Sequence, residues 1–591
     1  MKHFVKTLLA VICALVLLRI VGFLLLIGIL GSAFSGSGSA PIPRSGVLDL
    51  NLSEFELGEQ TQLDALPSDI ASIQNGVLPV IGLHDAVQAL KAAATDPAVQ
   101  YVLLRADGMQ AGMAHAEELR QALSDVRSNG KAVVAYMEAP GNGSVYLSSV
   151  ADKVFIGSFH GQTYQLVGLS SQLIFLKDIL DKVGVNVQLI RHGKYKSAGE
   201  MFIRSSASPE NLEQNQLVIN SAWSAYRDAI AASRDLDPAQ LDQLVDRLAF
   251  NSPEDFREHG LADEVVDHET LLGRLCTLSQ VDQPEQLKLI PFADYLQARV
   301  VPALSARNQV AILYADGEIV EGRQLTEVAG DRFVQEIDRL RKDSHVKAVV
   351  LRVNSPGGSV SASEKIRAAL DLLQKEKPLV ASYGNYAASG GYWISNGCQK
   401  IYADATTITG SIGVFSMIPE LSQVTKKVGV NFQTVGSNKH SDLYSLMRPF
   451  DKDELAYMQA SVEDIYERFV NLVASSREKA PEQIDALAQG RVWLGSDALE
   501  RGLVDEIGTL EDAVAYAAAL AGYHASDEYA AVGYPKPLTM WENLLQQISG
   551  KQEPAILDGT PFKGLASQLE TLKKGQPGVV YARLPYALEI R

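Results

Sequence analysis

The chain reads Ala348-Val349-Val350-Leu351-Arg352-Val353-Asn354-Ser355-Pro356-Gly357-Gly358-Ser359 in its second half, and this stretch decides the fold. Its apolar run predicts a buried strand, and the Pro-Gly-Gly that follows predicts a tight loop. The pattern continues on both sides: residues 310–314 and 379–383 are typical of strands, and residues 331–342 and 361–374 of helices. Strand–helix–strand units at this spacing predict parallel pairing with right-handed crossovers. The fold class is therefore α/β.

The pattern occurs twice in the chain. Three segments of the first half have similar counterparts in the second half, in the same order and at nearly the same separation. The paired segments are 101–105 with 348–352, 131–135 with 377–381, and 182–187 with 427–432. We therefore expect two copies of one α/β domain, at residues 46–300 and 301–533. Long helices are expected at matching places, 212–233 and 452–476, each packed against a neighbouring domain. Residues 534–591 form an extension to which the sequence assigns no role.

A second informative segment is Tyr386-Ala387-Ala388-Ser389-Gly390-Gly391-Tyr392. Ser389 is flanked by small residues, as a nucleophile that a substrate must reach requires. Glycine lets a backbone N–H approach a substrate carbonyl, so the N–H groups of Gly390 and Gly358 are candidates to hold a developing oxyanion. Each glycine segment alone is more typical of structure, as a helix N-cap or a turn. Together, in this order, they favour catalysis.

Serine also needs a base, and the segment Arg191-His192-Gly193-Lys194-Tyr195-Lys196-Ser197-Ala198 offers Lys196. Serine–lysine pairs are a known variant of the catalytic triad. An unperturbed lysine has a pKa of about 10.4, so we expect burial between the two copies to lower the pKa of Lys196 toward about 7 to 8. Ser197 or another hydroxyl would orient the amine. A competing interpretation is a Ser-His-Asp triad that uses His440 or His192 with Asp442.

Three motifs carry a resemblance to a known family: Asn354-Ser355-Pro356-Gly357-Gly358, Ala387-Ala388-Ser389-Gly390-Gly391-Tyr392 and Thr409-Gly410-Ser411-Ile412-Gly413-Val414. Together they resemble the protease IV family of signal peptide peptidases, in its long form, over nearly the whole chain. The resemblance implies a tandem repeat of two domains similar to Clp protease and crotonase. It implies a dyad of Ser389 and Lys196, with Lys194 as the residue most easily mistaken for the base. It also implies a homo-oligomeric ring or bowl, with the tetramer as one candidate.

Alignment of the two copies divides this site between them. Ser389 falls on Gly143, and the upstream Gly-Gly falls on Gln110-Ala111, so the first copy lacks the nucleophile and the glycine loop. The second copy has residues 437–441 where the first has the Lys196 segment, and it lacks the Tyr-Lys-Ser pattern there. We therefore predict one complete site per chain, built from both copies.

The N-terminus indicates a membrane location. Residues 7–30 are apolar apart from one arginine, and they are long enough to span a bilayer. Lys2 and Lys6 precede this run, so the positive-inside rule keeps the N-terminus in the cytoplasm and puts the catalytic domains in the periplasm. We expect residues 1–45 to be an anchor and linker that cross a bacterial inner membrane once. A cleaved signal peptide is the competing interpretation, because Gly31-Ser32-Ala33 offers small residues.

Composition limits the partners and cofactors of the chain. A net charge of −17 argues against nucleic-acid binding. Three cysteines do not make a disulfide framework, since Cys13 lies in the apolar run and Cys276 and Cys398 lie in different copies. The ten histidines show no ligand spacing, so we expect neither a metal site nor a cofactor.

Three functions remain open on the sequence. The resemblance implies a membrane-anchored serine endopeptidase that degrades released signal peptides and other apolar or unfolded peptides. The crotonase fold also serves acyl-CoA chemistry, in which a glycine loop binds a thioester oxyanion, although an extracytoplasmic location speaks against that reading. The last class is a catalytically inactive scaffold, against which the presence of both Ser389 and Lys196 argues.

Overall fold

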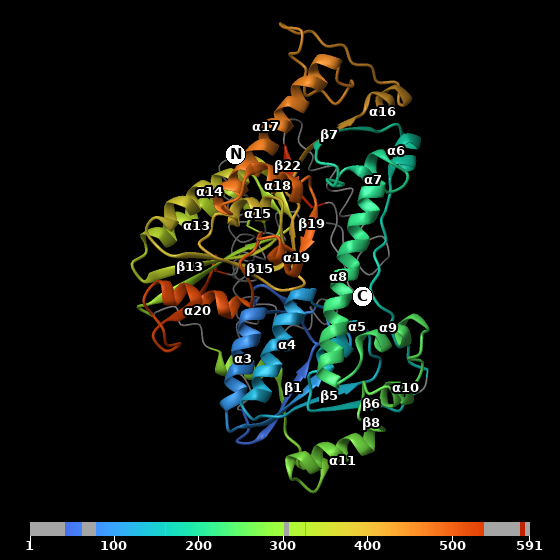
Figure 1. The fold of residues 1–591 in the computed structure, drawn as a ribbon, viewed down its shortest axis with the longest axis vertical. Coiled ribbons are helices and arrows are strands. Elements are labelled where there is room, and N and C mark those ends of the chain that lie inside the picture. The colour runs from blue at the N-terminus through green and yellow to red at the C-terminus, as the bar shows by residue number, and fades with distance from the viewer. Residues whose placement is uncertain are drawn as a thin grey trace, which may run out of the picture.

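The computed structural model describes residues 42–61, 78–159, 161–300, 306–325, 327–536 and 580–584. The apolar run at 7–30, on which the predicted anchor depends, lies outside these residues. Among the described helices, none is both long enough and apolar enough to cross a membrane. Figure 1 shows two α/β regions, one formed by the blue and green part of the chain and the other by the yellow and orange part.

The first copy is built on a parallel sheet with the strand order β8-β6-β5-β4-β1-β9. Aliphatic side chains fill the central strands and are buried on both faces, as expected for a parallel sheet covered by helices. Its strands, with the separate parallel pair β2 and β3, are β1 (Gly46–Asn51), β2 (Glu56–Gly58), β3 (Val80–Gly82), β4 (Val99–Arg105), β5 (Val133–Met137), β6 (Lys153–Gly157), β8 (Glu264–Val266) and β9 (Leu289–Pro291). Its helices are α3 (Leu83–Thr95), α4 (Met113–Ser128), α5 (Asn142–Ser148), α6 (Lys177–Val183), α7 (Glu200–Ile203), α8 (Pro209–Arg234), α9 (Pro238–Asp246), α10 (Pro253–Glu258), α11 (His268–Ser279) and α12 (Phe292–Arg299).

The second copy has a sheet with the order β19-β17-β15-β13-β10-β21, in which only the β17–β19 pair of this path is antiparallel. Its strands are β10 (Gln309–Asp316), β13 (Val346–Ser355), β15 (Leu379–Ala388), β16 (Ile401–Ala403), β17 (Ile408–Gly410), β19 (Val492–Leu494), β20 (Glu506–Ile507) and β21 (Ala530–Tyr534). Its helices are α13 (Gly330–Lys342), α14 (Val360–Gln374), α15 (Gly390–Ser395), α16 (Ser422–Lys427), α17 (Lys452–Ser476), α18 (Pro481–Leu487), α19 (Gly495–Glu500) and α20 (Leu510–Leu520). The predicted strands correspond to β10, β13 and β15 and the predicted helices to α13 and α14, so the α/β prediction is confirmed.

Matching contacts in the two copies support the duplication. Lys131 Nζ donates to the carbonyl of Asp96 at 2.6 Å in the first copy. Lys377, its aligned partner, donates to the carbonyl of Asp343 at 2.5 Å in the second. In both copies the lysine before a central strand thus bonds to the C-cap residue of the helix that leads into the neighbouring strand, α3 in the first copy and α13 in the second.

The two long predicted helices are present and join the copies. α8 begins one residue after Ser208, whose side chain caps it, and packs against β19 of the second copy. α17 begins after Asp451, which forms a capping box with Glu454, and packs against β7 (Asn186–His192) of the first copy. Each helix therefore reaches from its own copy to the other, and Figure 1 shows α8 running along the side of the molecule between them.

A third sheet joins the copies directly. Its order is β12-β11-β14-β22-β18-β7, with strands β11 (Ile319–Val320), β12 (Val328–Ala329), β14 (Gly357–Ser359), β18 (Val414–Glu420) and β22 (Tyr581–Arg583). β7 comes from the first copy and pairs antiparallel with β18 of the second along its whole length, from His192 opposite Val414 to Asn186 opposite Glu420. This sheet fixes the position of the chain that follows β7.

A buried charge network also holds the copies together. Arg352 of β13 is fully buried, and its guanidinium lies 2.9 Å from Glu59 and 2.8 Å from Glu118, both in the first copy. Glu59 also lies 2.9 Å from His115. Burial acts to raise the pKa of Glu59, but Arg352 and His115 outweigh it and lower that pKa to about 2. The carboxylate is therefore ionised, and its charge is matched across the junction.

Candidate active site

Ser389 lies where β15 ends and α15 begins. Its φ of 57° and ψ of −111° are unusual for a residue with a side chain, and such a conformation costs about 1–3 kcal/mol. Its N–H donates to the carbonyl of Gly410, on the neighbouring strand β17, at 2.8 Å. At Gly391 a Cβ would lie 2.8 Å from the Ser355 carbonyl oxygen, so only glycine lets the turn pack here. The surrounding backbone thus holds a strained serine at the end of a central strand.

Lys196 belongs to the loop that follows β7. The loop is tied to the second copy by the Tyr195 N–H, which donates to the Gln489 carbonyl at 2.9 Å. Gly490 has a φ of +77°, and a Cβ there would lie 2.6 Å from Lys196 N, so the two backbones meet without an intervening side chain. The lysine is therefore directed into the second copy by β-sheet pairing and by close backbone packing.

The two side chains meet in a buried site. Lys196 Nζ lies 2.8 Å from Ser389 Oγ, and both residues are fully buried. Ser389 Oγ also lies 3.5 Å from the Gly413 carbonyl. Burial lowers the pKa of Lys196 well below its usual value, because desolvation disfavours the ammonium form. This arrangement has the geometry that a serine nucleophile and an amine base require.

The structure also brings Ser411, which the sequence did not single out, into contact with the lysine. Lys196 Nζ lies 2.9 Å from Ser411 Oγ and 3.1 Å from the Ser411 carbonyl. Ser197, which the sequence offered to orient the amine, has a buried Oγ without a hydrogen-bond partner among the described residues. The available signal was the Thr-Gly-Ser-Ile-Gly-Val motif, but the motif does not show that Ser411 adopts a φ of 50° or that it lies beside the lysine.

The two predicted oxyanion glycines lie next to one another. A Cβ built on Gly390 would lie 3.0 Å from the backbone nitrogen of Gly358. A Cβ on Gly358 would lie 1.9 Å from the Ile319 carbonyl oxygen, so glycine is required there. Gly357 has a φ of +97°, which also favours glycine. The Pro-Gly-Gly loop therefore brings a backbone N–H to the start of α15, where α15's own first N–H groups lack helical partners.

The other candidate bases have different surroundings. Lys194 is exposed, and its Nζ lies 5.0 Å from the ring centroid of the neighbouring tyrosine. His192 stacks on Tyr466 with ring centroids 3.9 Å apart. Asp442 accepts hydrogen bonds from Arg448 at 2.6 and 2.9 Å. These contacts account for the residues of the competing interpretations without reference to a nucleophile.

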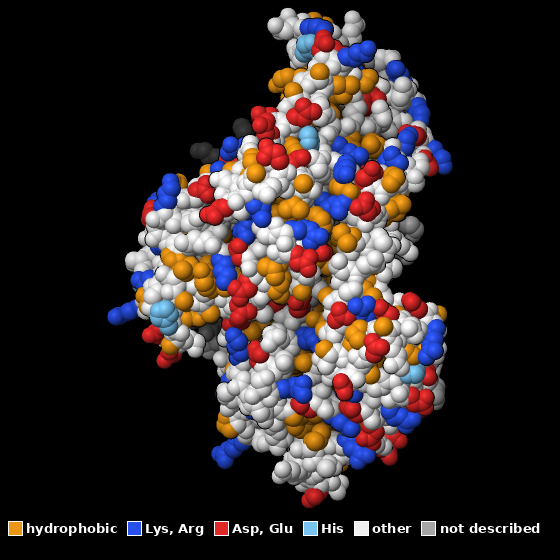
Figure 2. Space-filling view, viewed as in Figure 1, with side chains coloured by type: hydrophobic (Ala, Val, Ile, Leu, Met, Phe, Trp, Pro, Cys, Tyr) orange, Lys and Arg blue, Asp and Glu red, His pale blue; other side chains and the backbone are white. Residues whose placement is uncertain are grey.

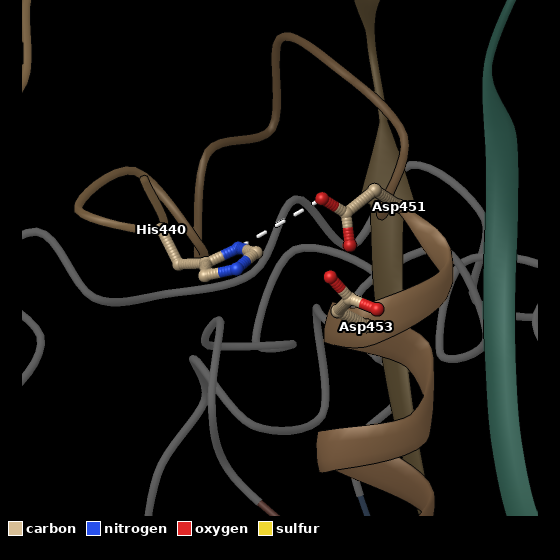
Figure 3. A group of neighbouring side chains, drawn as sticks. All are labelled: His440, Asp451 and Asp453. Carbon is tan, nitrogen blue, oxygen red and sulfur yellow. Dashed lines mark ion pairs between the residues drawn. The ribbon is translucent and has the colours of Figure 1, made fainter. Parts of the chain in front are cut away.

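His440 belongs to a surface group with Asp451 and Asp453 (Figure 3). His440 Nδ1 lies 3.8 Å from Asp451 and 3.0 Å from Glu454. Lys439 Nζ lies 2.6 Å from Asp453. Basic side chains thus already pair with the carboxylates, and such an exposed cluster carries no metal assignment by itself.

The corresponding part of the first copy is built for packing. Gly143, aligned with the nucleophile, lies inside α5 and has no side chain. Tyr146, three residues later, stacks on Tyr226 of α8 with ring centroids 3.9 Å apart. Gln110, aligned with the glycine loop, forms a β-bridge with Glu56. The strand and the helix after it are retained, but the aligned position lies within the helix and carries no hydroxyl.

A buried serine and lysine on a Clp-like α/β fold point to the class of serine hydrolases. The chain belongs to peptidase family S49, whose sequence profile matches residues 125–282 and 371–524. A Clp protease profile matches residues 303–404. The α/β architecture with two parallel, Clp-like domains is thus shown by both the structure and the sequence profiles.

Full-length relatives agree with this assignment. Protease 4 of Haemophilus influenzae is 35% identical over 505 residues, which cover 83% of this chain and 82% of that protein. Protease 4 of Salmonella typhi is 35% identical over 511 residues, 84% of this chain and 81% of that one. The chloroplastic serine protease SPPA of Arabidopsis thaliana is 29% identical over 504 residues, 83% of this chain and 73% of that one. The chain is therefore a serine peptidase of family S49, which favours the peptidase over the acyl-CoA alternative.

Proposed function

We propose that the chain is a serine endopeptidase in which Ser389 is the nucleophile and Lys196 the general base. The observation that carries this proposal is the 2.8 Å contact between Lys196 Nζ and Ser389 Oγ. A base must be unprotonated at working pH, and burial favours the neutral amine at Lys196. Ser411 holds the amine toward the serine through its hydroxyl and its carbonyl.

The reaction follows from these positions. Ser389 Oγ attacks the peptide carbonyl while Lys196 takes the hydroxyl proton. The N–H groups of Gly358 and Gly390 hold the oxyanion, and each such donor is worth about 3 to 4 kcal/mol in the transition state. The Lys196 ammonium then protonates the leaving amine, which gives an acyl-enzyme and a neutral base. A water molecule, deprotonated by the same amine, releases the acyl group and regenerates Ser389.

The site is assembled from two domains, which we assign to residues 46–300 and 301–533. The first supplies Lys196 and the second supplies Ser389, Ser411 and both glycines. The antiparallel pairing of β7 with β18 supports this division of labour, since it joins the copies beside the site. Neither domain alone contains the full set of groups.

We assign the chain to the inner membrane of a bacterium, with residues 1–45 as anchor and linker and the catalytic domains in the periplasm. The apolar run at 7–30 and the lysines before it support this assignment. The substrates are released signal peptides and other apolar or unfolded peptides, as the family resemblance implies. A peptidase tethered beside the membrane meets such substrates where they are released.

We also propose that the chain assembles as a homo-oligomeric ring or bowl. Apolar side chains are exposed together where α6 meets α16, two helices joined by a hydrogen bond from Lys427 Nζ to the Lys182 carbonyl at 2.7 Å. Exposed apolar groups of this kind are typical of protein–protein contacts. The exposed residues are Ile179, Val183, Val428, Val430, Phe432 and Val435. On the face drawn in Figure 2, acidic and basic side chains are interspersed, and apolar side chains gather near the upper end.

Active-site labelling tests the proposal. A fluorophosphonate probe should label the wild-type chain and fail to label Ser389→Ala, because the probe reacts with an activated serine. Lys196→Ala should also abolish labelling, while Lys194→Ala should keep it, since Lys194 is exposed and lies on the same loop. Labelling of Lys196→Ala at the wild-type rate would overturn the role given to the lysine.

A further inference from the structure

Helix α4 of the first copy begins without a capping side chain of its own. Its N-cap residue is Gly112, and the first N–H groups of a helix have no partners within the helix. Asn385 of the second copy supplies the missing acceptor, because its Oδ1 accepts from the Ala114 N–H at 3.1 Å and from the His115 N–H at 3.4 Å. These N–H groups belong to the second and third residues of α4, which an N-cap side chain usually serves. A side chain of one copy therefore caps a helix of the other.

The N-cap glycine makes room for this contact. A Cβ on Gly112 would lie 2.1 Å from Asn385 Oδ1. Gly112 has a φ of −75° and a ψ of 166°, which a residue with a side chain also adopts, so glycine is required here by space and not by backbone conformation. Figure 1 shows α4 at the junction of the two α/β regions, and α4 packs against β15, the strand that carries Asn385. The contact is thus part of the packing between the copies.

Asn385 lies in a bulge of β15, four residues before Ser389. Between Val353 and Ser355 the register of the β13–β15 pair shifts, because β13 advances by two residues while β15 advances by four. The extra residues bend β15 locally, and bulges beside active sites commonly re-aim a side chain. The bulge therefore lies where it sets the direction in which the strand delivers the nucleophile.

Side chains hold the bulge where the strand ladder is interrupted. Thr407 Oγ1 donates to the Gly384 carbonyl at 2.8 Å. The Tyr386 N–H donates to Asn354 Oδ1 at 3.3 Å, and Asn354 directly precedes the Ser-Pro-Gly-Gly loop. Asn385, between these two anchored residues, extends the same support to the first copy.

A second side chain of the first copy supports the neighbouring strand. Glu117 of α4 accepts from the N–H groups of Ala405 and Thr406 at 3.0 and 3.1 Å and from the Thr406 hydroxyl at 2.8 Å. These residues lead into β17, whose Gly410 carbonyl accepts from the Ser389 N–H at 2.8 Å. α4 therefore holds both strands that fix the strained backbone of Ser389.

We propose that Asn385 is a positioning residue for catalysis, which caps α4 of the first copy and thereby fixes the bulge that presents Ser389. A strained backbone conformation such as that of Ser389 persists only where its surroundings impose it, and the α4 contacts are part of those surroundings. The inference rests on the proposed function, since it concerns the placement of the nucleophile named there. It adds that the first copy supplies the base and also holds the nucleophile in its reactive position.

The first test removes the cap and uses the full-length protein with a short chromogenic peptide. Asn385→Ala should lower kcat about 10–100-fold and leave KM nearly unchanged, because a misplacement of about 1 Å can cost about 100-fold in rate. Asn385→Asp keeps an acceptor for both N–H groups and places a negative charge at a helix N-terminus, where it is favourable, so it should keep most of the wild-type kcat. Asp267→Ala is the matched control, since it removes the N-cap of α11, where Asp267 accepts from the Thr270 N–H at 2.7 Å. It should lower the denaturation midpoint about as much as Asn385→Ala does and leave kcat unchanged.

The second test disturbs the same contact from the first copy. Gly112→Ala puts a methyl group where Asn385 Oδ1 lies, and it should lower kcat as Asn385→Ala does. In the double variant the clash is gone, so Gly112→Ala should cause no further loss of kcat there. Gly141→Ala, at the N-cap of α5, is the matched control and should keep the wild-type kcat, because a Cβ there would lie 3.7 Å from its nearest neighbour.

Three results would overturn the inference: a wild-type kcat in Asn385→Ala, an equal loss of kcat in Asp267→Ala, or losses of kcat that multiply in the double variant. Failure of the proposed function would look different. The wild-type chain would then resist the fluorophosphonate probe, while Asn385→Ala would still lower the denaturation midpoint.

Discussion

The two copies of the domain each begin a helix after a central strand, but the entry to that helix differs. In the second copy a single residue, Ser389, separates β15 from α15, and it adopts a strained, positive φ. In the first copy four residues separate β5 from α5; the last of them, Gly141, is extended with a φ of −110° and a ψ of −172°, and Gly143, aligned with Ser389, lies inside the helix. Strain is thus kept where the hydroxyl must be presented and is absent where the helix only packs. A duplicated domain can therefore lose its catalytic groups and still keep its fold.

The aligned arginines Arg105 and Arg352 give a second contrast. Arg105 pairs with Asp49 within the first copy and is 37% exposed. Arg352 is fully buried and pairs with Glu59 and Glu118 of the other copy. The same position therefore became a surface pair in one copy and a link between domains in the other. The division of the active site depends on such links, because Lys196 reaches Ser389 only when the copies are docked.

The largest expected effect is the loss of kcat in variants of the Ser389–Lys196 dyad. Ser389→Ala and Lys196→Ala should each lower kcat by at least about 10⁴-fold, and the double variant should be no worse, because residues that act as one unit are not additive. Initial rates on a peptide substrate measure this. Lys194→Ala, on the same loop, should keep most of the activity. A Lys196→Ala protein with near-wild-type rates would end the serine–lysine proposal.

The arginine pair should show the next largest effect, on stability. Arg352→Met leaves Glu59 and Glu118 buried without their partner and should destabilise the protein by about 3–5 kcal/mol. Arg105→Met removes a partly exposed pair and should cost about 0–1 kcal/mol. Denaturant unfolding of both variants measures the difference. Similar losses for the two arginines would show that the junction is not the critical link.

The same network predicts a loss of stability in acid. Arg352 and His115 outweigh the effect of burial and lower the folded-state pKa of Glu59 to about 2. A carboxylate with a lowered pKa stabilises the fold above its unfolded value of about 4.3, and this stabilisation is lost as pH falls toward about 2. The free energy of unfolding of the wild type, measured from about pH 6 down to about pH 3, should decline over this range. In Arg352→Met the decline should be weaker, since the main counter-charge of Glu59 is gone.

Ser411→Ala should have an intermediate effect on rate. It removes the hydroxyl 2.9 Å from Lys196 Nζ but leaves the backbone carbonyl contact. Positioned general bases contribute about 10²–10⁴-fold, so partial loss of orientation should lower kcat by about 10–100-fold with little change in KM. Ser197→Ala, on the lysine loop, is the matched control and should be near wild type. An unchanged kcat in Ser411→Ala would show that the Ser411 carbonyl alone is enough to orient the amine.

The pH–rate profile should show a smaller, graded effect. Only the neutral amine accepts a proton, so kcat/KM should fall tenfold per pH unit below the pKa of Lys196. Burial lowers that pKa well below its usual value, so the rate should already be maximal at pH values where an exposed lysine is still charged. A profile that rises only above about pH 10, where a free lysine titrates, would contradict the burial argument.

The sequence predicted the central strands and helices because burial on both faces and helical periodicity leave a local signature. It also named the serine and both glycines from the small residues around them, and the lysine from the need for a base together with the family resemblance. It did not predict the third sheet, since β7, β18 and β22 come from three distant parts of the chain and pair only after folding. Ser411 was missed for the same reason, because its contact with Lys196 depends on a positive φ and on the docking of the copies.

The smallest expected effect comes from restoring a hydroxyl to the first copy. Gly143→Ser in the Ser389→Ala background should regain neither fluorophosphonate labelling nor peptide cleavage. The aligned loop there is Gln110-Ala111 in place of two glycines, so the oxyanion would have no matching N–H. Stability should change little, because a Cβ at Gly143 would lie 2.9 Å from Met109 Cε, the movable end of a flexible side chain. Gly143→Ala separates the effect of size from that of the hydroxyl. Labelling of the Gly143→Ser protein would show instead that the first copy retains chemistry of its own, and the division between the copies would then be one of degree.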